Sequence, residues 1–293
     1  MRAFAKGTRR GELGQLNEMP HVLVWMPTIP YAKLERVRGL YAFTTLSTDP
    51  QRKPYFRPPF VSVNEVFMSK PNLLFLMPDQ LRHDFLSCYG ASFIDTPHID
   101  LLAAEGIRYD CAYSTSPVCV AARHNLLTGL NSIRTGVLGN GQFLRPDYSA
   151  CGIATWPELI ARVGYRSVAI GKMHFYPWDA SMGFDDRVIC EDKRWLHIQD
   201  DYADYLAERG LNKLHGNEHD GYLENRGAII HQHAFEDSWD YFVGDSAAEY
   251  IRTYSDERPF AMMVGFPGPH CPYDPSPEYA DCYRPEDMPD SIP

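Results

Sequence analysis

Three short apolar runs separated by helix-like segments constrain the fold of this chain most strongly. LLFLM covers residues 73–77, RSVAI covers residues 166–170 and FAMMVGF covers residues 260–266. A short, uninterrupted apolar run such as LLFLM is typical of a strand buried on both faces, as in a parallel sheet covered by helices. We therefore expect a strand at each of these three positions.

The segments between these runs have helical patterns and helix-ending residues. We expect helices at IDLLAAEG, which ends at Gly106, at residues 120–127, at WPELIARVG and at EDSWDYFVGDSAAEYIRTY, with a further strand at IRYDCAYS, residues 107–114. Pro157 suits a first helical turn, and Gly129 and Gly164 suit helix ends. Alternating strands and helices predict an α/β fold with a largely parallel sheet flanked by helices.

Residues 1–67 show neither a helical nor a strand period, whereas Met68 opens the patterned sequence. We interpret residues 1–67 as an irregular N-terminal arm, or as an extension that is not native to the fold, with a small extra subdomain as the alternative. The folded domain is expected at residues 68–293. The arm should then pack few apolar side chains against this domain.

Charge and cysteine usage narrow the class of protein. The formal net charge is −10, so no basic surface for nucleic acid is expected, and an anion would need positive charge concentrated in a pocket. No apolar stretch is long enough to cross a bilayer, and the N-terminus makes a poor signal peptide. Seven cysteines without a CxxC pair favour reduced thiols, so we expect a cytoplasmic protein.

Polar side chains follow each of the three apolar runs. Asp79 and Gln80 follow the first, Lys172 and His174 the second, and His270 the third. Ligands of open α/β sheets bind outside the carboxyl ends of the strands, so these side chains are expected to converge on one edge. Taken singly, each has a plainer interpretation as a turn residue, a solvated lysine or a structural histidine.

Cys119 stands at the start of the helix expected from residue 120. Free backbone N–H groups there favour negative charge. Arg123 falls one turn later on the same face and can pair with an oxyanion. A small buried cysteine beside a surface arginine is the alternative interpretation.

Four blocks resemble the sulfatase family of the alkaline-phosphatase superfamily, in the family's order and at about its spacings. They are KPNLLFLMPDQLRHD, TPHIDLLAAEGIRYDCAYSTSPVCVAARHNLLTGL, AIGKMHF and GFPGPHCPYDP, and the resemblance covers roughly residues 70–293. It implies an alkaline-phosphatase-like fold and the hydrolysis of sulfate esters. It also implies that Cys119 is oxidised by a maturation enzyme to formylglycine, whose hydrate is the nucleophile.

The resemblance assigns roles to the site residues as expectations. Asp79, Gln80 and modified Cys119 would bind a divalent cation, with calcium expected first and magnesium or manganese as alternatives. Arg123 would hold the formylglycine. Lys172 and His174 would contact the aldehyde hydrate or the transferred group. His270 would bind the anion or assist the leaving group, and Asn140 would contact the anion.

Two departures from the common pattern keep alternatives open. Gln80 stands where many sulfatases have a second aspartate. This Asp-Gln pair is more similar to the choline-sulfatase and phosphonate-monoester-hydrolase branches. A phosphonate monoester or phosphodiester is therefore an alternative small-molecule substrate. Ala121 replaces the usual proline of the cysteine motif, a variant similar to those matured by radical-type enzymes.

A third hypothesis is an inactive fragment. The chain contains no Asp-His-Gly sequence and stops before the family's later metal-site motif and late lysine. This hypothesis rests on the apparent C-terminal truncation, and it predicts weak metal binding and poor or absent turnover of aryl sulfates by the 293-residue chain alone.

Five histidines lie between Arg187 and Phe235, and their role is open. They are His197, His215, His219, His231 and His233. A second metal site is one interpretation. An irregular insertion near the substrate mouth is the one we favour, because these histidines are not matched by cysteines or carboxylates at the spacing of a ligand motif.

Overall fold

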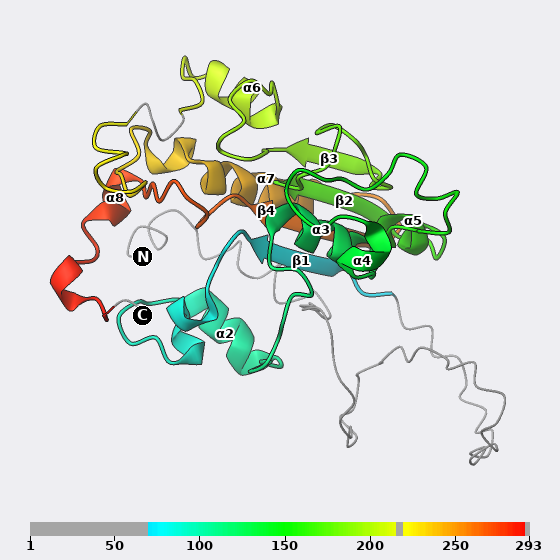
Figure 1. The fold of residues 1–293 in the computed structure, drawn as a ribbon, viewed down its shortest axis with the longest axis horizontal. Helices are drawn as coiled ribbons and strands as arrows, with labels where there is room; N and C mark the ends of the chain where they lie inside the picture. The colour runs from blue at the N-terminus through cyan, green and yellow to red at the C-terminus, as the bar shows by residue number, and fades with distance from the viewer. Residues whose placement is uncertain (1–69, 215–218, 291–293) are drawn as a thin grey trace, which may run out of the picture.

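The structure is a computed structural model that describes residues 70–214 and 219–290. Its centre is a sheet of four parallel strands, β1 (Leu73–Pro78), β2 (Arg166–Gly171), β3 (Asp186–Ile189) and β4 (Phe260–Phe266). The strand order is β1-β4-β2-β3, so the last strand along the chain lies between the first two (Figure 1). This confirms the expected α/β fold with a largely parallel sheet.

Seven labelled helices accompany the sheet in the described residues. They are α2 (Pro97–Glu105), α3 (Cys119–Thr128), α4 (Ser132–Thr135), α5 (Trp156–Ala161), α6 (Asp201–Ala207), α7 (Trp239–Thr253) and α8 (Pro277–Ala280). Short 3-10 turns cover His83–Phe85, Ser87–Tyr89, Phe235–Asp237 and Pro285–Asp287. Helix α3 ends at Gly129, whose φ of 68° lies in the left-handed region. A capping box between Thr155 and Glu158 begins α5.

Alternate residues of the central strands face opposite sides of the sheet. Met262 and Val264 of β4 pack with Val243 of α7 in one buried cluster. Met263, between them, packs with Leu127 of α3 in a second cluster. Both faces are therefore covered by helices (Figure 1), which explains why the strands read as apolar runs.

Some expected elements differ from the structure. Residues 107–114 were expected to form a strand but form a loop, and Ile107 and Tyr113 are exposed. The alternating pattern fits a half-buried strand, yet no strand of the described sheet pairs with this segment, and strand propensity counts only beside a partner. The segment expected to be irregular, from Arg187 to Phe235, contains most of β3 and all of α6. The expectation for residues 1–67 lies outside the described residues.

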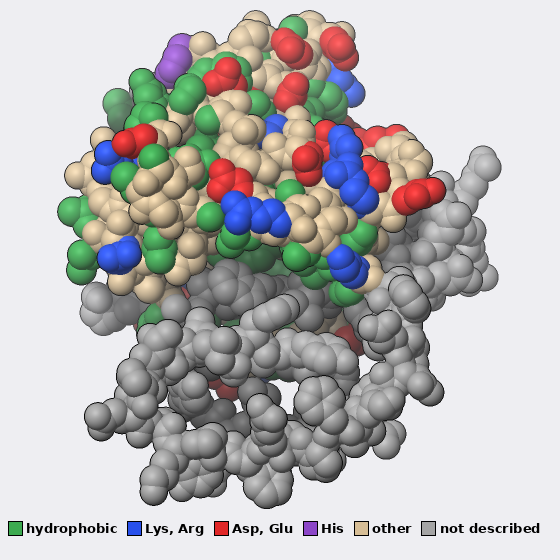
Figure 2. Space-filling model, turned by 90° about the vertical axis from the view of Figure 1, so that its right-hand side faces the viewer, with side chains coloured by type: hydrophobic (Ala, Val, Ile, Leu, Met, Phe, Trp, Pro, Cys, Tyr) green, Lys and Arg blue, Asp and Glu red, His purple; other side chains and the backbone are tan. Residues whose placement is uncertain are grey.

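The described surface mixes charges of both signs. On the face in Figure 2, lysine and arginine side chains lie beside aspartate and glutamate side chains. Within residues 70–214 and 219–290, no helix combines the length and apolar character needed to cross a bilayer. All seven cysteines are unpaired.

Candidate active site

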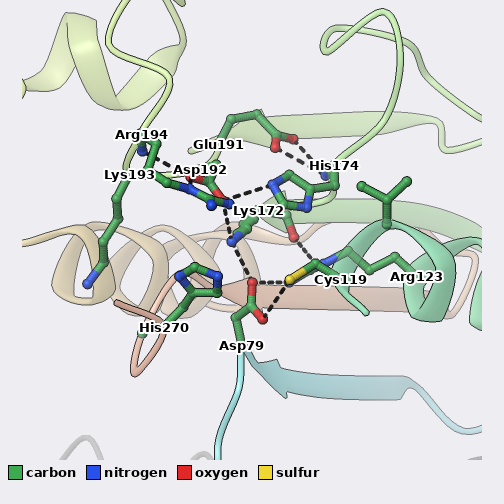
Figure 3. A network of polar contacts seen from close by, with 12 residues as sticks. Asp79, Cys119, Arg123, Lys172, His174, Glu191, Asp192, Lys193, Arg194 and His270 are labelled. Atoms are coloured by element: carbon green, nitrogen blue, oxygen red, sulfur yellow. Dashed lines mark hydrogen bonds and ion pairs between the residues drawn. The ribbon is translucent and has the colours of Figure 1, made fainter. Parts of the chain in front are cut away.

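The carboxyl ends of the strands bring most of the expected site residues together. Asp79 directly follows β1, Lys172 follows β2, and His270 lies four residues beyond β4. Cys119 is the first residue of α3 and points toward Asp79 (Figure 3). The space among these four side chains is called the pocket. The convergence expected from the strand-end pattern is present in the structure.

Asp79 is the central anion of this pocket. Its Oδ2 atom lies 2.5 Å from Nζ of Lys172 and 3.3 Å from a guanidinium nitrogen of Arg123. Its Oδ1 atom lies 3.8 Å from Sγ of Cys119. Burial alone would raise the pKa of the Asp79 carboxyl, but the charges of Arg123 and Lys172 outweigh burial and lower it. Asp79 is therefore a buried, ionised carboxylate.

Cys119 is a protonated thiol in this environment. Burial raises its pKa, and the charge of Asp79 raises it further. The helix N-terminus was expected to favour negative charge here, but these two effects dominate. The Oδ1 atom of Asn140 accepts a hydrogen bond from the backbone N–H of Val120 at 3.1 Å, so the Asn140 side chain caps α3 beside Cys119.

Gly265 lets the backbone of Lys172 and the side chain of Arg123 lie close to β4 beneath the pocket. A guanidinium nitrogen of Arg123 donates to the carbonyl oxygen of Lys172. A Cβ atom at Gly265 would lie 2.1 Å from this same carbonyl oxygen. Only glycine fits at position 265 without moving the Lys172 backbone.

Asp192 is a site residue that the sequence analysis missed. It follows β3, and its Oδ2 atom lies 2.7 Å from Nζ of Lys172 and 3.0 Å from Nε2 of His174. Arg194 binds the same carboxylate through two nitrogens, at 2.6 and 2.8 Å. Burial acts to raise the pKa of Asp192, but the hydrogen bonds from Arg194 and His174 and the charge of Lys172 lower it far below its ordinary value.

His174 is held in an unusual backbone conformation. Its φ is 56°, in the left-handed region. The buried carboxylate of Glu191 accepts hydrogen bonds from the backbone N–H groups of Met173 and His174, at 3.1 to 3.2 Å. The ring of Trp195 packs on the His174 ring with centroids 5.1 Å apart. Burial lowers the pKa of His174 to about 4, so the ring is neutral near pH 7.

His270 and Gln80 occupy the other side of the pocket. Nδ1 of His270 donates a hydrogen bond to the carbonyl oxygen of Cys271 at 2.7 Å, so Nε2 is its unprotonated nitrogen when the ring is neutral. Burial lowers the pKa of His270. Gln80 is exposed, with a φ of 64° directly after Asp79.

One group of described residues is compact enough to contribute to a metal site. Ligand atoms of Asp79, Cys119 and His270 all lie within 4.8 Å of one another. Lys172 and Arg123 both contact Oδ2 of Asp79. The Oδ1 atom faces Cys119 and is the oxygen that Asp79 can offer to a metal ion. A hard cation prefers oxygen ligands, so the residues fit such an ion once position 119 carries oxygen in place of sulfur.

The histidine cluster lies apart from this group. Ring centroids of His219 and His231 are 5.1 Å apart, and those of His231 and His233 are 4.9 Å apart. Among the described residues these histidines do not form a group with ligand atoms close enough for one metal ion. His197 is exposed, and His215 lies outside the described residues.

A parallel sheet covered on both faces, with buried cations and a thiol at its carboxyl edge, defines an α/β domain that can receive an anionic group. The profile of the sulfatase family matches residues 71–292, and the chain belongs to that family.

Two curated relatives and one solved structure illustrate the similarity. An arylsulfatase of Clostridium perfringens is 29% identical over 237 residues, which are 76% of this chain and 48% of the relative. A choline-sulfatase of Rhizobium meliloti is 28% identical and is matched over 41% of its length. A phosphonate monoester hydrolase of Agrobacterium radiobacter has the same fold, with a TM-score of 0.59 over 75% of this chain and 45% of that one, at 21% identity. The chain thus spans less than half the length of these proteins.

Proposed function

We propose that this chain hydrolyses sulfate esters, with the residue at position 119 as the nucleophile. The observation that carries the proposal is the position of Cys119 in the same pocket as Lys172 and Asp79, within a sulfatase-family domain. Two buried cations, Lys172 and Arg123, can attract an anionic ester into this pocket.

The unmodified thiol is poorly suited to this chemistry, because burial and Asp79 raise its pKa. We propose that a maturation enzyme converts Cys119 to formylglycine, whose hydrate supplies one hydroxyl for attack and a second for release of sulfate. Asn140 would keep the start of α3 in place beside it, through the hydrogen bond to Val120.

We propose that Asp79, together with Gln80 and the modified residue 119, holds a divalent cation. Calcium is the ion we favour, with magnesium and manganese as alternatives, because the donors would be oxygens. Such an ion supplies positive charge that neutralises the ester oxygens. Asp79 offers it Oδ1, since Lys172 and Arg123 contact Oδ2.

The remaining residues would bind and orient the ester. Lys172 carries an ammonium group at the centre of the pocket and can contact a sulfate oxygen after releasing one of its two carboxylate partners. His270 presents Nε2 without a proton, so it must first be protonated before it can donate to a departing alcohol. A bound anion would favour that protonation.

The test is a paired assay of the protein coexpressed with a formylglycine-generating enzyme, in excess calcium. We expect an aryl sulfate to be hydrolysed faster than the matching aryl phosphonate monoester. The Cys119→Ala variant should be inactive, and the exposed-site control Cys151→Ala should keep its activity. Mass spectrometry of the peptide containing Cys119 should detect the aldehyde.

Faster phosphonate hydrolysis would favour the alternative substrate class. Activity that survives Cys119→Ala would contradict the proposed nucleophile.

A further inference from the structure

The carboxylate of Asp192 accepts hydrogen bonds from Lys172, His174 and Arg194 behind the pocket. We infer that Asp192 is a positioning residue, which fixes His174 with its proton on Nε2 and so makes Nδ1 the proton-accepting atom of the pocket. The tautomer follows from the geometry alone. Its use in hydrolysis rests on the function proposed above.

The first step is the direction of the hydrogen bond between Asp192 and His174. Nε2 of His174 lies 3.0 Å from Oδ2 of Asp192, and the Asp192 side chain is 1% exposed. Lys172 at 2.7 Å and Arg194 at 2.6 Å both donate to this carboxylate and keep it ionised. An ionised carboxylate only accepts hydrogen bonds, so Nε2 must be the donor.

The second step concerns the other ring nitrogen. A neutral imidazole carries one proton, and that proton is on Nε2. Nδ1 of His174 is therefore an acceptor. It is buried and has no hydrogen-bond partner in the described part of the chain. The ring nitrogen that is not bonded to Asp192 points toward the side of the pocket where Cys119 lies (Figure 3). A buried acceptor without a partner is costly, and a hydroxyl group in the pocket would satisfy it.

The third step is that the His174 ring has little freedom to turn. Trp195 packs against the ring, and Glu191 fixes the backbone N–H groups of residues 173 and 174. A flipped ring would place a carbon atom where Nε2 now meets Asp192. The flip would therefore sacrifice a charge-assisted hydrogen bond.

These contacts define one proton transfer. A hydroxyl group bound in the pocket gives its proton to the Nδ1 lone pair, and the electron pair of the broken O–H bond stays on oxygen. The resulting imidazolium has both nitrogens protonated, and Asp192 stabilises its charge through Nε2. Return of the Nδ1 proton to the departing group or to water restores the starting tautomer.

Nuclear magnetic resonance of ¹⁵N-histidine-labelled protein tests the tautomer without any assay of turnover. The His174 resonances are assigned as those that disappear in the His174→Gln variant. In the wild-type protein at pH 7, these resonances should show a ring protonated at Nε2 and unprotonated at Nδ1. The Nε2 proton should lie far downfield and exchange slowly. A wild-type ring protonated at Nδ1, or at both nitrogens, would overturn the assignment.

Variants test the dependence on Asp192. In Asp192→Ala the downfield Nε2 proton signal should move upfield or vanish through exchange, whereas Arg194→Gln, which removes a different partner of Asp192, should keep it. Asp192→Asn, of the same size, should also shift the signal, because one amide oxygen then serves three donors. It replaces the alanine variant if that one unfolds. A signal unchanged in the variants of Asp192 would refute the inference.

Kinetics separate this inference from the proposed function. If sulfate esters are the substrates, Asp192→Ala should lower kcat by about 10²- to 10⁴-fold, the usual contribution of a general base, with a smaller change in KM. A full kcat in Asp192→Ala would contradict the positioning role. Absence of turnover in the wild-type protein would count against the proposed function alone, since the resonance experiment decides the tautomer independently.

Discussion

The ammonium nitrogen of Lys172 lies 2.5 Å from Oδ2 of Asp79, and both side chains are almost completely buried. The two groups compensate each other's burial, and Lys172 has a second carboxylate partner in Asp192. Taking two such charges out of water is costly even when they are paired, and removing one partner is strongly destabilising because the other charge stays buried without compensation.

The Asp79→Asn variant should therefore be strongly destabilised. Removing one partner of a buried ion pair costs about 3–5 kcal/mol, and we expect the lower end because Lys172 keeps Asp192. Urea unfolding of the variant and of wild type measures the difference in the free energy of unfolding. The control is Asp84→Asn, at an exposed ion pair with Arg82, which should barely change stability. Equal effects of the two substitutions would contradict the buried pairing.

Calcium should raise the melting temperature of the wild-type protein if Asp79 helps to hold the ion. A ligand that binds only the folded state stabilises it by about 2.7 kcal/mol at a concentration one hundred times its Kd. Differential scanning fluorimetry over a calcium titration measures this rise, and a chelator should reverse it. The rise should be absent in Asp79→Asn, and a rise of equal size there would exclude Asp79 as a ligand.

The Gly265→Ala variant should be destabilised through a clash with the backbone. The added Cβ would lie 2.1 Å from the carbonyl oxygen of Lys172, so the end of β2 or of β4 must shift. We expect a loss of about 1–3 kcal/mol, the usual cost of overpacking a core. The control Gly139→Ala has no atom within 4 Å of the added Cβ and should change stability little. Thermal unfolding of both variants gives the comparison.

Stability should fall on acidification because His231 is buried in its neutral form. Burial first, and then the charges of neighbouring His233 and His219, lower its pKa from 6.5 to about 3. Between these pH values the unfolded chain binds a proton that the folded chain does not. The contribution of neutral His231 to the free energy of unfolding is therefore fully present above pH 6.5 and is lost as the pH falls toward about 3.

Chemical denaturation at several pH values measures this slope, which is at most about 1.4 kcal/mol per pH unit for one proton. His231→Gln should flatten the slope, whereas His197→Gln, at an exposed position, should leave it unchanged. An unchanged slope in His231→Gln would show that other groups dominate the acid sensitivity.

Three strands and most site residues could be predicted from the sequence, for a physical reason. β1, β2 and β4 lie beside one another; β2 and β4 are buried on both faces and β1 is partly buried, so each is an apolar run followed by polar residues. The strand-end pattern therefore located Asp79, Lys172 and His270.

β3 could not be predicted in the same way, because it is a four-residue strand at the edge of the described sheet and its sequence begins with Asp186 and Arg187. Without it, Glu191 and Asp192 could not be recognised. The available signal was the same as elsewhere, an apolar Val188-Ile189-Cys190 segment followed by two acids. Conversely, residues 107–114 had a strand-like pattern, but no strand of the described sheet lies beside them to pair with.

The edge position of β3 affects how the site would fail under stress. β3 pairs with β2 over only four residues, yet it delivers the two acids that hold His174 by its backbone and its ring. Short edge strands open with less free energy than a buried core strand. Mild denaturant should therefore release His174 while β1 and β4 remain paired. Chemical competence of this domain would then be lost in a local opening event, well before cooperative unfolding of the sheet.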